Sequence, residues 1–354
     1  MTIDLHPFAR VQLGHRPTPI DHALNLSADI GIDLWIKRDD CTGLAFGGNK
    51  VRQLEFYMGE AQAREADTVL ITGAVQSNFM RTTAAAARLL GMDPHLQLEQ
   101  RVAKNDERYF QSGNVHLERL LGATLYDFED GEDEAAADAN LERIAAKLVA
   151  KGRKPYVIHL GISHAPIGGL GYVVAAQEIT EQIGAMEALS DAGRDDKVDA
   201  KFDAIVVASG SALTHAGLLT GLRALGDTTP VHGICVRRPV AEQGPRVLQR
   251  AREIAAMIGH NALITDADVL VHDEVFFPSY GTLNDATWNA IDKAARMEAL
   301  FLDPVYTGRT LAGCIALVKQ GVLRKDSRVL LMHTGGQPAL FAYESDLQAR
   351  IEQR

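Results

Sequence analysis

Short runs of β-branched and other apolar residues alternate with longer helical stretches along most of the chain, and this alternation limits the fold more than any other feature. The runs that indicate strands are residues 34–37, 68–72, 95–98, 156–160, 204–208, 231–236, 269–271 and 328–332. Apolar residues with helical spacing lie between them, for example at 52–66 and 82–90. Strands that alternate with helices are typical of βαβ units, and nearly all-apolar strands are typical of sheets covered on both faces. The sequence therefore predicts an α/β protein built from open, twisted parallel sheets.

Length and charge narrow the class of protein further. At 354 residues the chain is long enough for two domains or one large α/β domain, and its net charge of −10 argues against a nucleic-acid partner. Cys41, Cys235 and Cys314 are too few and too far apart for a disulfide framework, which fits a reducing compartment. The N-terminus lacks the apolar region of a signal peptide, and no apolar run is long enough to span a bilayer. We expect a cytoplasmic protein with no membrane partner.

Several common catalytic signatures are missing from the sequence. It has no P-loop, no G-x-S-x-G, no H-E-x-x-H and no strand followed by G-x-G-x-x-G. Its twelve histidines are scattered without the spacing of metal ligands, so we expect no metal site. Two polar stretches, 129–140 and 191–203, are interpreted as solvated surface segments.

Four turns carry chemically useful residues where a strand ends and a helix begins, which is the edge at which open α/β sheets bind ligands. In the first turn, residues 46–50 (FGGNK) place Lys50 at the start of a helix. The helix dipole disfavours a cation there, which lowers the pKa of the amine and favours a nucleophile. The alternative is a solvated lysine that only begins a helix.

The other three turns offer groups that bind anions. Residues 72–78 end in Ser77 and Asn78, which either cap the following helix or bind a carboxylate. Residues 209–217 (SGSALTHAG) follow a very apolar strand and favour a phosphate cradle at a helix N-terminus over a bare turn. Residues 333–336 (HTGG) form the last of these turns. A lysine amine and a phosphate cradle suggest a cofactor that carries an aldehyde and a phosphate.

A set of motifs in this sequence resembles one enzyme family over nearly the whole chain. The motifs are residues 37–40 (KRDD), 47–50 (GGNK), 54–55 (LE), 76–78 (QSN), 155–158 (PYVI), 209–217, 303–308 (DPVYTG) and 333–341 (HTGGQPALF). The set is similar to the D-cysteine desulfhydrase and 1-aminocyclopropane-1-carboxylate deaminase group of fold-type II pyridoxal-phosphate (PLP) enzymes. The resemblance implies a fold like that of the tryptophan synthase β-subunit, PLP as cofactor, and a homodimer. It also implies a small α/β domain at 53–165, inserted into a large PLP-binding domain made of residues 1–52 and 166–354.

The resemblance also implies roles for the matching positions. Lys50 would hold the cofactor as a Schiff base and move protons during the reaction, with Ser77, Tyr280 and Tyr306 as the other catalytic residues. Asn78 would lie near the phenolic oxygen of the cofactor, and Thr307 or Thr334 would meet its pyridine nitrogen. The residues expected to hold the phosphate are Ser209, Gly210, Ser211, Ala212, Leu213 and Thr214. The residues expected to contact the substrate are Ser77, Asn78, Phe79, His164, Tyr280 and Tyr306.

Departures from the family pattern bear on the substrate. Thr307 stands where the deaminases have a glutamate, which favours β-elimination over ring opening. Phe79 replaces a histidine usual in the desulfhydrases, and Leu213 replaces a glycine of their phosphate loop. His164 belongs to a changed turn (GISH, 161–164), where it either reshapes the substrate pocket or is a hydrogen-bonded loop histidine. The stretch 40–44 (DCTGL) is more similar to the L-cysteate sulfo-lyases of the same family.

The resemblance therefore implies a PLP-dependent carbon–sulfur lyase. Its substrate would be a small sulfur-bearing amino acid of the D-cysteine or L-cysteate type, and its products pyruvate, ammonia and sulfide or sulfite. The alternatives on the same fold are the cyclopropane deaminase and a small-amino-acid racemase. A rival of another class is a ligand-binding protein that kept the fold and lost catalysis. The presence of Lys50, Ser77, Tyr280 and Tyr306 argues against that rival, whereas Leu213 leaves phosphate binding open.

Overall fold

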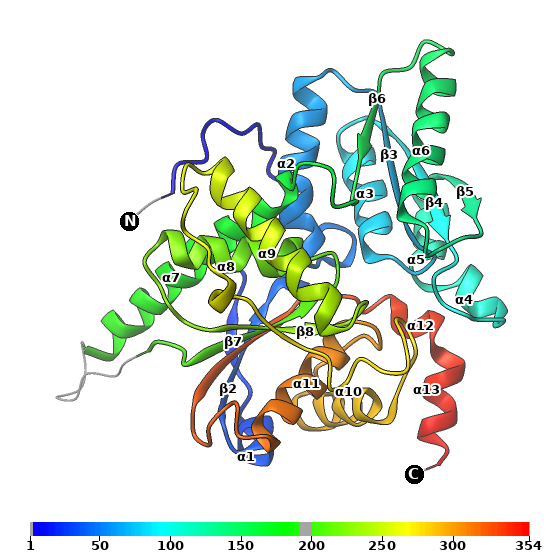
Figure 1. The fold of residues 1–354 in the computed structure, drawn as a ribbon. Coiled ribbons are helices and arrows are strands. Elements are labelled where there is room, and N and C mark those ends of the chain that lie inside the picture. The colour runs from blue at the N-terminus through cyan, green and yellow to red at the C-terminus, as the bar shows by residue number, and fades with distance from the viewer. Residues whose placement is uncertain (1–2, 192–199, 354) are drawn as a thin grey trace.

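Two sheets organise the computed structural model, which describes residues 3–191 and 200–353 (Figure 1). The larger sheet has the strand order β1 (Ile20–His22), β2 (Asp33–Arg38), β10 (Arg328–His333), β7 (Ala204–Ser209), β8 (Val231–Cys235) and β9 (Leu270–His272). The smaller sheet has the order β5 (Thr124–Phe128), β4 (Asp93–Glu99), β3 (Thr68–Ala74) and β6 (Pro155–Ile158). Every pairing is parallel except that of β1 with β2. The predicted α/β class with two parallel sheets is confirmed.

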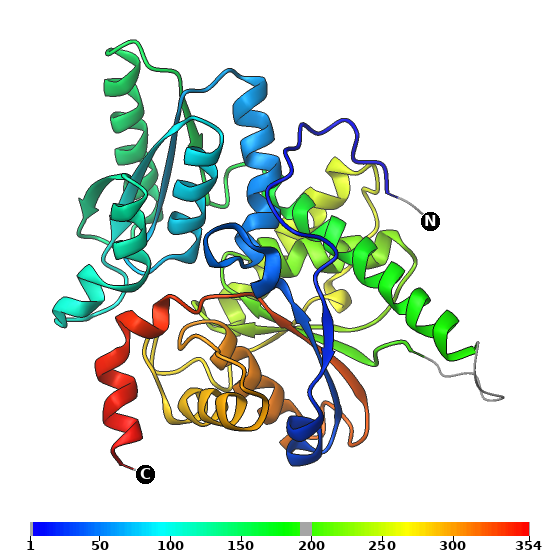
Figure 2. The same cartoon turned by 180° about the vertical axis from the view of Figure 1, so that it is seen from behind.

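Helices cover both faces of each sheet (Figures 1 and 2). The α-helices are α1 (Leu24–Ile30), α2 (Asn49–Ala63), α3 (Asn78–Leu89), α4 (Glu107–Gln111), α5 (Gly113–Leu120), α6 (Glu134–Val149), α7 (Leu170–Asp191), α8 (Leu213–Ala224), α9 (Val240–Met257), α10 (Asp285–Glu298), α11 (Thr307–Lys319), α12 (Ala339–Ala342) and α13 (Glu344–Ile351). Short 3₁₀ turns are η1 (Asp39–Thr42), η2 (Leu44–Phe46), η3 (Ile167–Gly169) and η4 (Asp266–Asp268).

The core of the larger sheet shows why its strands are almost entirely apolar. Successive residues of a strand point to opposite faces. Ile205 and Val207 of β7 therefore pack with α7, α8 and α9, whereas Val206 packs with α1, α10 and α11. Both faces are buried, so neither can carry polar side chains at low cost. In the smaller sheet Ile71 packs towards α2 and α3, and Leu70 packs towards α6.

All eight predicted strands are present, with bounds that shift by no more than two residues. The sequence did not reveal β1 and β5, which lie at sheet edges and contain no fully buried residue, so they lack a buried apolar face. The helix predicted at 52–66 begins earlier, at Asn49, which places Lys50 in its first turn. The loop expected at 191–203 falls mostly outside the described residues.

Two properties of the chain bear on its wider organisation. Helix α2 contacts both α3 and α7 and runs unbroken across residue 53, so a domain boundary at that residue stays a prediction. Within residues 3–191 and 200–353, no helix combines the length and the apolar character that a membrane span requires.

Candidate active site

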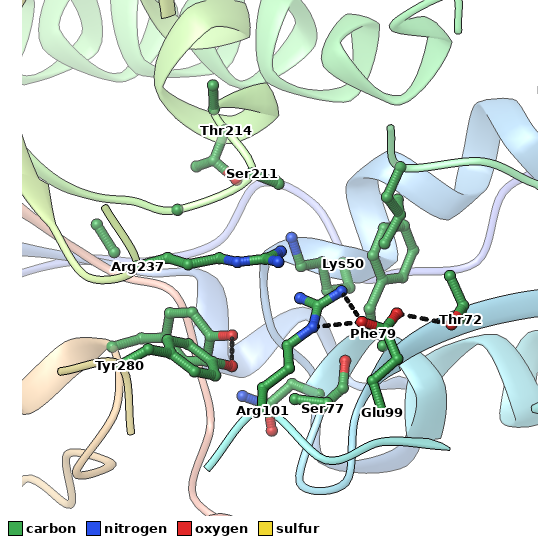
Figure 3. Close-up of a pocket in the computed structure, with 18 of the residues that line it drawn as sticks. Lys50, Thr72, Ser77, Phe79, Glu99, Arg101, Ser211, Thr214, Arg237 and Tyr280 are labelled. Atoms are coloured by element: carbon green, nitrogen blue, oxygen red, sulfur yellow. Dashed lines mark hydrogen bonds and ion pairs between the residues drawn. The ribbon is translucent and has the colours of Figure 1, made fainter. Parts of the chain in front are cut away.

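A pocket lies where turns from both sheets meet (Figure 3). Parallel strands bring their carboxyl ends to one edge of a sheet, so the turns that follow β3, β7 and β10 converge on it. The start of α2 adds Asn49 and Lys50 to the wall. The pocket therefore collects the polar turns that the sequence indicated, although they are up to about 280 residues apart along the chain.

Lys50 lies in the first turn of α2 with its side chain directed into the pocket. Gly48 precedes the helix as its N-cap residue; its φ of 115° suits glycine, and a Cβ there would lie 2.9 Å from the carbonyl oxygen of Thr334. Lys50 Nζ lies 3.4 Å from Gln53 Oε1 and 4.8 Å from the ring centre of Phe79. Burial lowers the pKa of Lys50 to about 8. At pH 7 about a tenth of the amine is therefore neutral and nucleophilic, far more than for an ordinary lysine.

The turn between β7 and α8 supplies an anion-binding cradle. Gly210, Ser211, Ala212 and Thr214 line the pocket at the N-terminus of α8, a helix of twelve residues. Ala212 has a φ of 75°, which is the left-handed conformation that turns the backbone into the helix. Free N–H groups at a helix start bind phosphate well, because the helix dipole adds to them.

Two members of the predicted cradle do not line the pocket. Ser209 Oγ accepts a hydrogen bond from Gln243 Nε2 at 2.8 Å and lies 3.2 Å from His215 Nδ1, fully buried under the turn. The side chain of Leu213 is buried in the core. Ser209 supports the turn from below, and Leu213 offers a phosphate its backbone alone.

Ser77, Asn78 and Phe79 line the pocket at the start of α3. Ser77 occupies the N-cap position, but its hydroxyl makes no capping hydrogen bond. Asn78 Oδ1 accepts hydrogen bonds from Arg81 Nη1 at 3.1 Å and from Asn114 Nδ2 at 3.0 Å. The amide of Asn78 is therefore held with a fixed orientation, and the Ser77 hydroxyl is available to a carboxylate.

Tyr280 and Tyr306 face the pocket as a hydrogen-bonded pair. Their hydroxyl oxygens are 2.7 Å apart, so one phenol donates to the other. Burial, with Tyr280 as its neighbour, raises the pKa of Tyr306 well above the ordinary value. That phenol stays protonated at neutral pH and can donate a proton or a hydrogen bond inside the pocket.

Thr334 lines the pocket, whereas Thr307 and His164 do not. Thr307 Oγ1 donates to Asp303 Oδ1 at 2.7 Å and accepts from the Asp303 amide at 2.8 Å, so its only proton is already used. This geometry favours Thr334 as the partner of a pyridine nitrogen. His164 lies behind the pocket wall, 3.6 Å from Asp138, whose side chain belongs to that wall.

Charged residues that sequence reasoning missed also line the pocket. Glu99 Oε1 accepts from Thr72 Oγ1 at 2.6 Å, and its other oxygen accepts from Arg101 Nε at 2.6 Å. Glu134 lies 3.0 Å from Arg237 and 3.4 Å from Arg246. The acidic stretch 129–140 is thus no plain solvated surface, because Glu134 and Asp138 face the pocket.

The position of two of these residues relative to the strands could have revealed them from the sequence. Arg101 follows β4 and Arg237 follows β8, and both stand at the carboxyl edge where ligands bind. No spacing within the sequence shows that Glu134 meets Arg237, 103 residues further on.

An α/β fold with a buried lysine amine, an anion cradle and paired tyrosines defines an enzyme that binds a phosphorylated aldehyde cofactor. Residues 11–335 match the family described as pyridoxal-phosphate dependent enzyme. The chain is 41% identical over 336 residues to the D-cysteine desulfhydrases of Salmonella choleraesuis (strain SC-B67) and Salmonella typhi, covering 95% of this chain and 96% of each relative. The chain therefore belongs to the pyridoxal-phosphate-dependent enzymes.

Solved structures agree with this assignment. A structure titled as an ACC deaminase homologue superimposes with a TM-score of 0.83 at 36% identity, covering 98% of this chain and 97% of that one. An O-ureido-L-serine synthase shares the fold, with a TM-score of 0.63 at 14% identity and 97% of both chains covered. The predicted fold-type II family and PLP cofactor are confirmed, and so is the lyase class at the level of the family.

Proposed function

We propose that this enzyme catalyses β-elimination from a small amino acid whose β-substituent is an anionic sulfur group, with L-cysteate as the favoured substrate. L-Cysteate and water would give pyruvate, ammonia and sulfite. D-Cysteine, on which the named relatives act, is the second candidate and would give sulfide instead. The 41% identity supports the reaction type, and the charges in the pocket support the choice of leaving group.

The residues of the pocket fit PLP. Lys50 offers a partly neutral amine for the aldehyde, and the backbone at residues 210–214 offers N–H groups for the phosphate. Asn78 and Thr334 would contact the ring. Thr214 Oγ1 accepts from Asn49 Nδ2 at 2.8 Å and from Gln53 Nε2 at 2.9 Å, which ties the cradle to the helix that carries Lys50. When bound, PLP supplies an electron sink that stabilises negative charge at the substrate α-carbon.

The reaction then depends on groups of this chain. Lys50 Nζ, with its lowered pKa, would take the proton from the substrate α-carbon. Ser77 and the N-terminus of α3 would bind the α-carboxylate and fix the α-carbon near Lys50. The Tyr280–Tyr306 pair would donate a hydrogen bond to the departing group.

The observation that carries the substrate proposal is a cluster of three arginines in the pocket wall, Arg101, Arg237 and Arg246, whose carboxylate partners there are Glu99 and Glu134. Figure 3 shows the guanidinium groups of Arg101 and Arg237 directed into the pocket near Lys50. Glu134 is the carboxylate that pairs with Arg237, Arg238 and Arg246, so three cations share one anion. Burial, together with the repulsion from Arg101, lowers the pKa of Arg237. A sulfonate would relieve this repulsion, whereas a neutral thiol would not.

The deciding experiment compares L-cysteate, D-cysteine and D-serine with purified holoenzyme, and measures pyruvate, ammonia, sulfite and sulfide. We expect L-cysteate to give pyruvate, ammonia and sulfite in equal amounts, with the highest kcat/KM. A higher kcat/KM for D-cysteine would overturn the substrate choice and leave β-elimination standing. Release of 2-oxobutanoate from the cyclopropane amino acid, or racemisation without keto acid, would overturn β-elimination itself.

A matched pair of variants tests the role of the arginines. Arg237→Gln removes a charge-assisted contact of about 1.5–3 kcal/mol, so kcat/KM for L-cysteate should fall roughly 10- to 100-fold. The value for D-serine, which has no anionic β-substituent, should change little. Arg64→Gln is the control, because Arg64 is exposed at the far end of α2. An equal loss for both substrates in Arg237→Gln would contradict sulfonate recognition.

We also propose, on the family resemblance, that the protein is a cytoplasmic homodimer with a small domain at residues 53–165. The position of the smaller sheet within residues 68–158 supports the domain division.

A further inference from the structure

The buried guanidinium of Arg81 connects two parts of the chain that would hold the PLP ring. Arg81 lies in the first turn of α3, three residues after Asn78, and its side chain is fully buried. Its Nη1 donates to Asn78 Oδ1 at 3.1 Å, and its Nη2 donates to the carbonyl oxygen of Gly47 at 2.9 Å. Gly47 lies three residues before Lys50. One cation therefore fixes both the turn that leads to the lysine and the amide of Asn78.

Arg81 also determines which way the amide of Asn78 is turned. A guanidinium can only donate hydrogen bonds, so the atom of Asn78 that it contacts must be the oxygen. The same argument fixes Asn114, whose Oδ1 accepts from Arg81 Nη1 at 2.7 Å and whose Nδ2 donates to Asn78 Oδ1 at 3.0 Å. Asn78 Oδ1 thus accepts two hydrogen bonds. Because Asn78 lines the pocket, its Nδ2 is the atom of the amide that remains for a ligand there.

The positive charge of Arg81 is not cancelled by a bonded carboxylate. Burial lowers the pKa of Arg81 only to about 10, so the group is charged at neutral pH, and its hydrogen bonds go to uncharged oxygen atoms. Two acids act on it from nearby, Glu118 and Asp303. Burial raises the pKa of Glu118 well above its ordinary value, which favours the neutral acid. Asp303 accepts hydrogen bonds from the backbone N–H groups of residues 305–307, which share its charge.

We propose that Arg81 is a positioning residue for the cofactor, which aims the N–H donors of Asn78 at the phenolic oxygen of PLP and favours the ionised form of that oxygen. This inference rests on the proposed placement of the PLP ring beside Asn78. A cation bonded to the carbonyl of an amide polarises it and strengthens its N–H groups as donors. Such donors stabilise an anionic acceptor more than a neutral one. Arg81 would act through Asn78, because it does not line the pocket itself.

A purely structural role for Arg81 is the alternative, and the absorbance of the bound cofactor separates the two roles. When PLP is linked to a lysine, the form with an ionised phenol absorbs in the visible, and the form with a neutral phenol absorbs in the near ultraviolet. The ratio of the two bands therefore reports how the protein tunes the cofactor. A structural role would lower the stability of the protein or its affinity for PLP and leave this ratio unchanged.

The test compares the spectra of purified holoenzymes without substrate at one fixed pH. In Arg81→Met the ratio of the visible to the near-ultraviolet band should fall roughly 10-fold, because a charge-assisted hydrogen bond is about twice as strong as a neutral one. Arg81→Lys should keep the ratio within about 2-fold of the wild-type value, since lysine is also charged and can only donate. Arg88→Met is the control and should leave the ratio unchanged, because Arg88 is exposed in the last turn of the same helix.

A second variant tests the effect of the charge without removing Arg81, in case Arg81→Met does not fold. Asn114→Asp keeps the size of the side chain and sets a carboxylate beside Arg81, at the position of the amide that now bonds to Arg81 and Asn78. The carboxylate would neutralise the cation and remove a donor to Asn78 Oδ1. The band ratio should therefore fall in Asn114→Asp as well.

An unchanged ratio in both Arg81→Met and Asn114→Asp would overturn the proposal. Asn78→Ala separates this failure from a wrong placement of the cofactor. A lower ratio in Asn78→Ala, with unchanged ratios in the other two variants, would leave the ring beside Asn78 and exclude Arg81 as its positioning residue. An unchanged ratio in Asn78→Ala would overturn the placement, and the proposal with it.

Discussion

Two opposing local effects set the protonation of Lys50. Burial disfavours the ammonium form, whereas the ring of Phe79, 4.8 Å from Nζ, stabilises it through a cation–π contact. Such a contact is worth about 0.5–2 kcal/mol. Burial prevails, because the pKa of Lys50 is lowered from 10.5 to about 8. The residue is therefore ready to attack an aldehyde without a separate base to deprotonate it.

The lowered pKa of Lys50 predicts how the pH controls cofactor capture. The neutral amine reacts with the aldehyde, and its fraction increases as the pH rises through the pKa. The rate at which cofactor-free protein regains bound PLP should therefore rise with a midpoint near pH 8. Stopped-flow absorbance measures this rate, and Nα-acetyl-lysine in solution controls for the ionisation of PLP itself. A midpoint near 10.5, as for an ordinary lysine, would contradict the burial argument.

At this scale the sequence predicts which turns matter better than which side chains point inward. Lys50, Ser77 and Tyr280 line the pocket as expected, because their turns end at the carboxyl edges of the sheets. Ser209 and Thr307 belong to such turns too, but their hydroxyls are used by buried partners. Gln243, the partner of Ser209, lies 34 residues away in a segment that local sequence does not link to it, whereas Asp303, the partner of Thr307, lies only four residues before it.

A buried network of charges fixes the start of α2 among its neighbours. Arg52 Nη2 lies 2.8 Å from Asp39 Oδ1 of η1 and 2.8 Å from Glu178 Oε1 of α7. Lys37 Nζ of β2 lies 2.6 Å from Glu178 Oε1. The side chains of Arg52, Asp39 and Lys37 are at most 2% exposed. The network therefore positions the helical turn that also carries Lys50, two residues before Arg52.

Removal of Arg52 should destabilise the protein strongly. Arg52→Met leaves Asp39 and Glu178 buried without their main partner, and the loss of one member of a buried ion pair costs about 3–5 kcal/mol. Urea unfolding measures the change in the free energy of unfolding. Arg64→Met, at the other end of the same helix, is the control and should cost no more than about 1 kcal/mol, because the Arg64 side chain is 65% exposed. Equal costs for the two variants would show that the network does not stabilise α2.

Elements with buried faces were the ones that the sequence could predict. Each central strand carries an apolar run because helices cover both of its faces, and those runs identify β3, β7, β8 and β10. The strand β5 (TLYDF) at the sheet edge carries no such run. The apolar pattern alone begins α2 too late, at residue 52, whereas the turn 46–50 places Lys50 at the helix start, in agreement with the structure.

For the whole molecule, the active site depends on the meeting of the two sheets. The smaller sheet supplies Ser77, Asn78, Glu99 and Arg101 through the turns after β3 and β4, and the larger sheet supplies the phosphate cradle and Arg237. In Figures 1 and 2 the smaller sheet and its helices α3 and α6 lie to one side of the larger sheet. Helix α2 lies beside both sheets. The ion pairs of Glu134 with Arg237 and Arg246 cross between these two parts. In the proposed function, the substrate, the cofactor and Lys50 would therefore be held by parts of the chain whose proximity the sequence alone does not show.

The proposed function requires that PLP is attached to Lys50. Reduction of the purified holoenzyme with borohydride makes that linkage permanent, and peptide mass spectrometry then identifies the modified lysine. We expect one phosphopyridoxyl group per chain, on the peptide that contains Lys50, and none in Lys50→Arg. A modified lysine elsewhere, or an unmodified Lys50 in protein that still binds PLP, would contradict it.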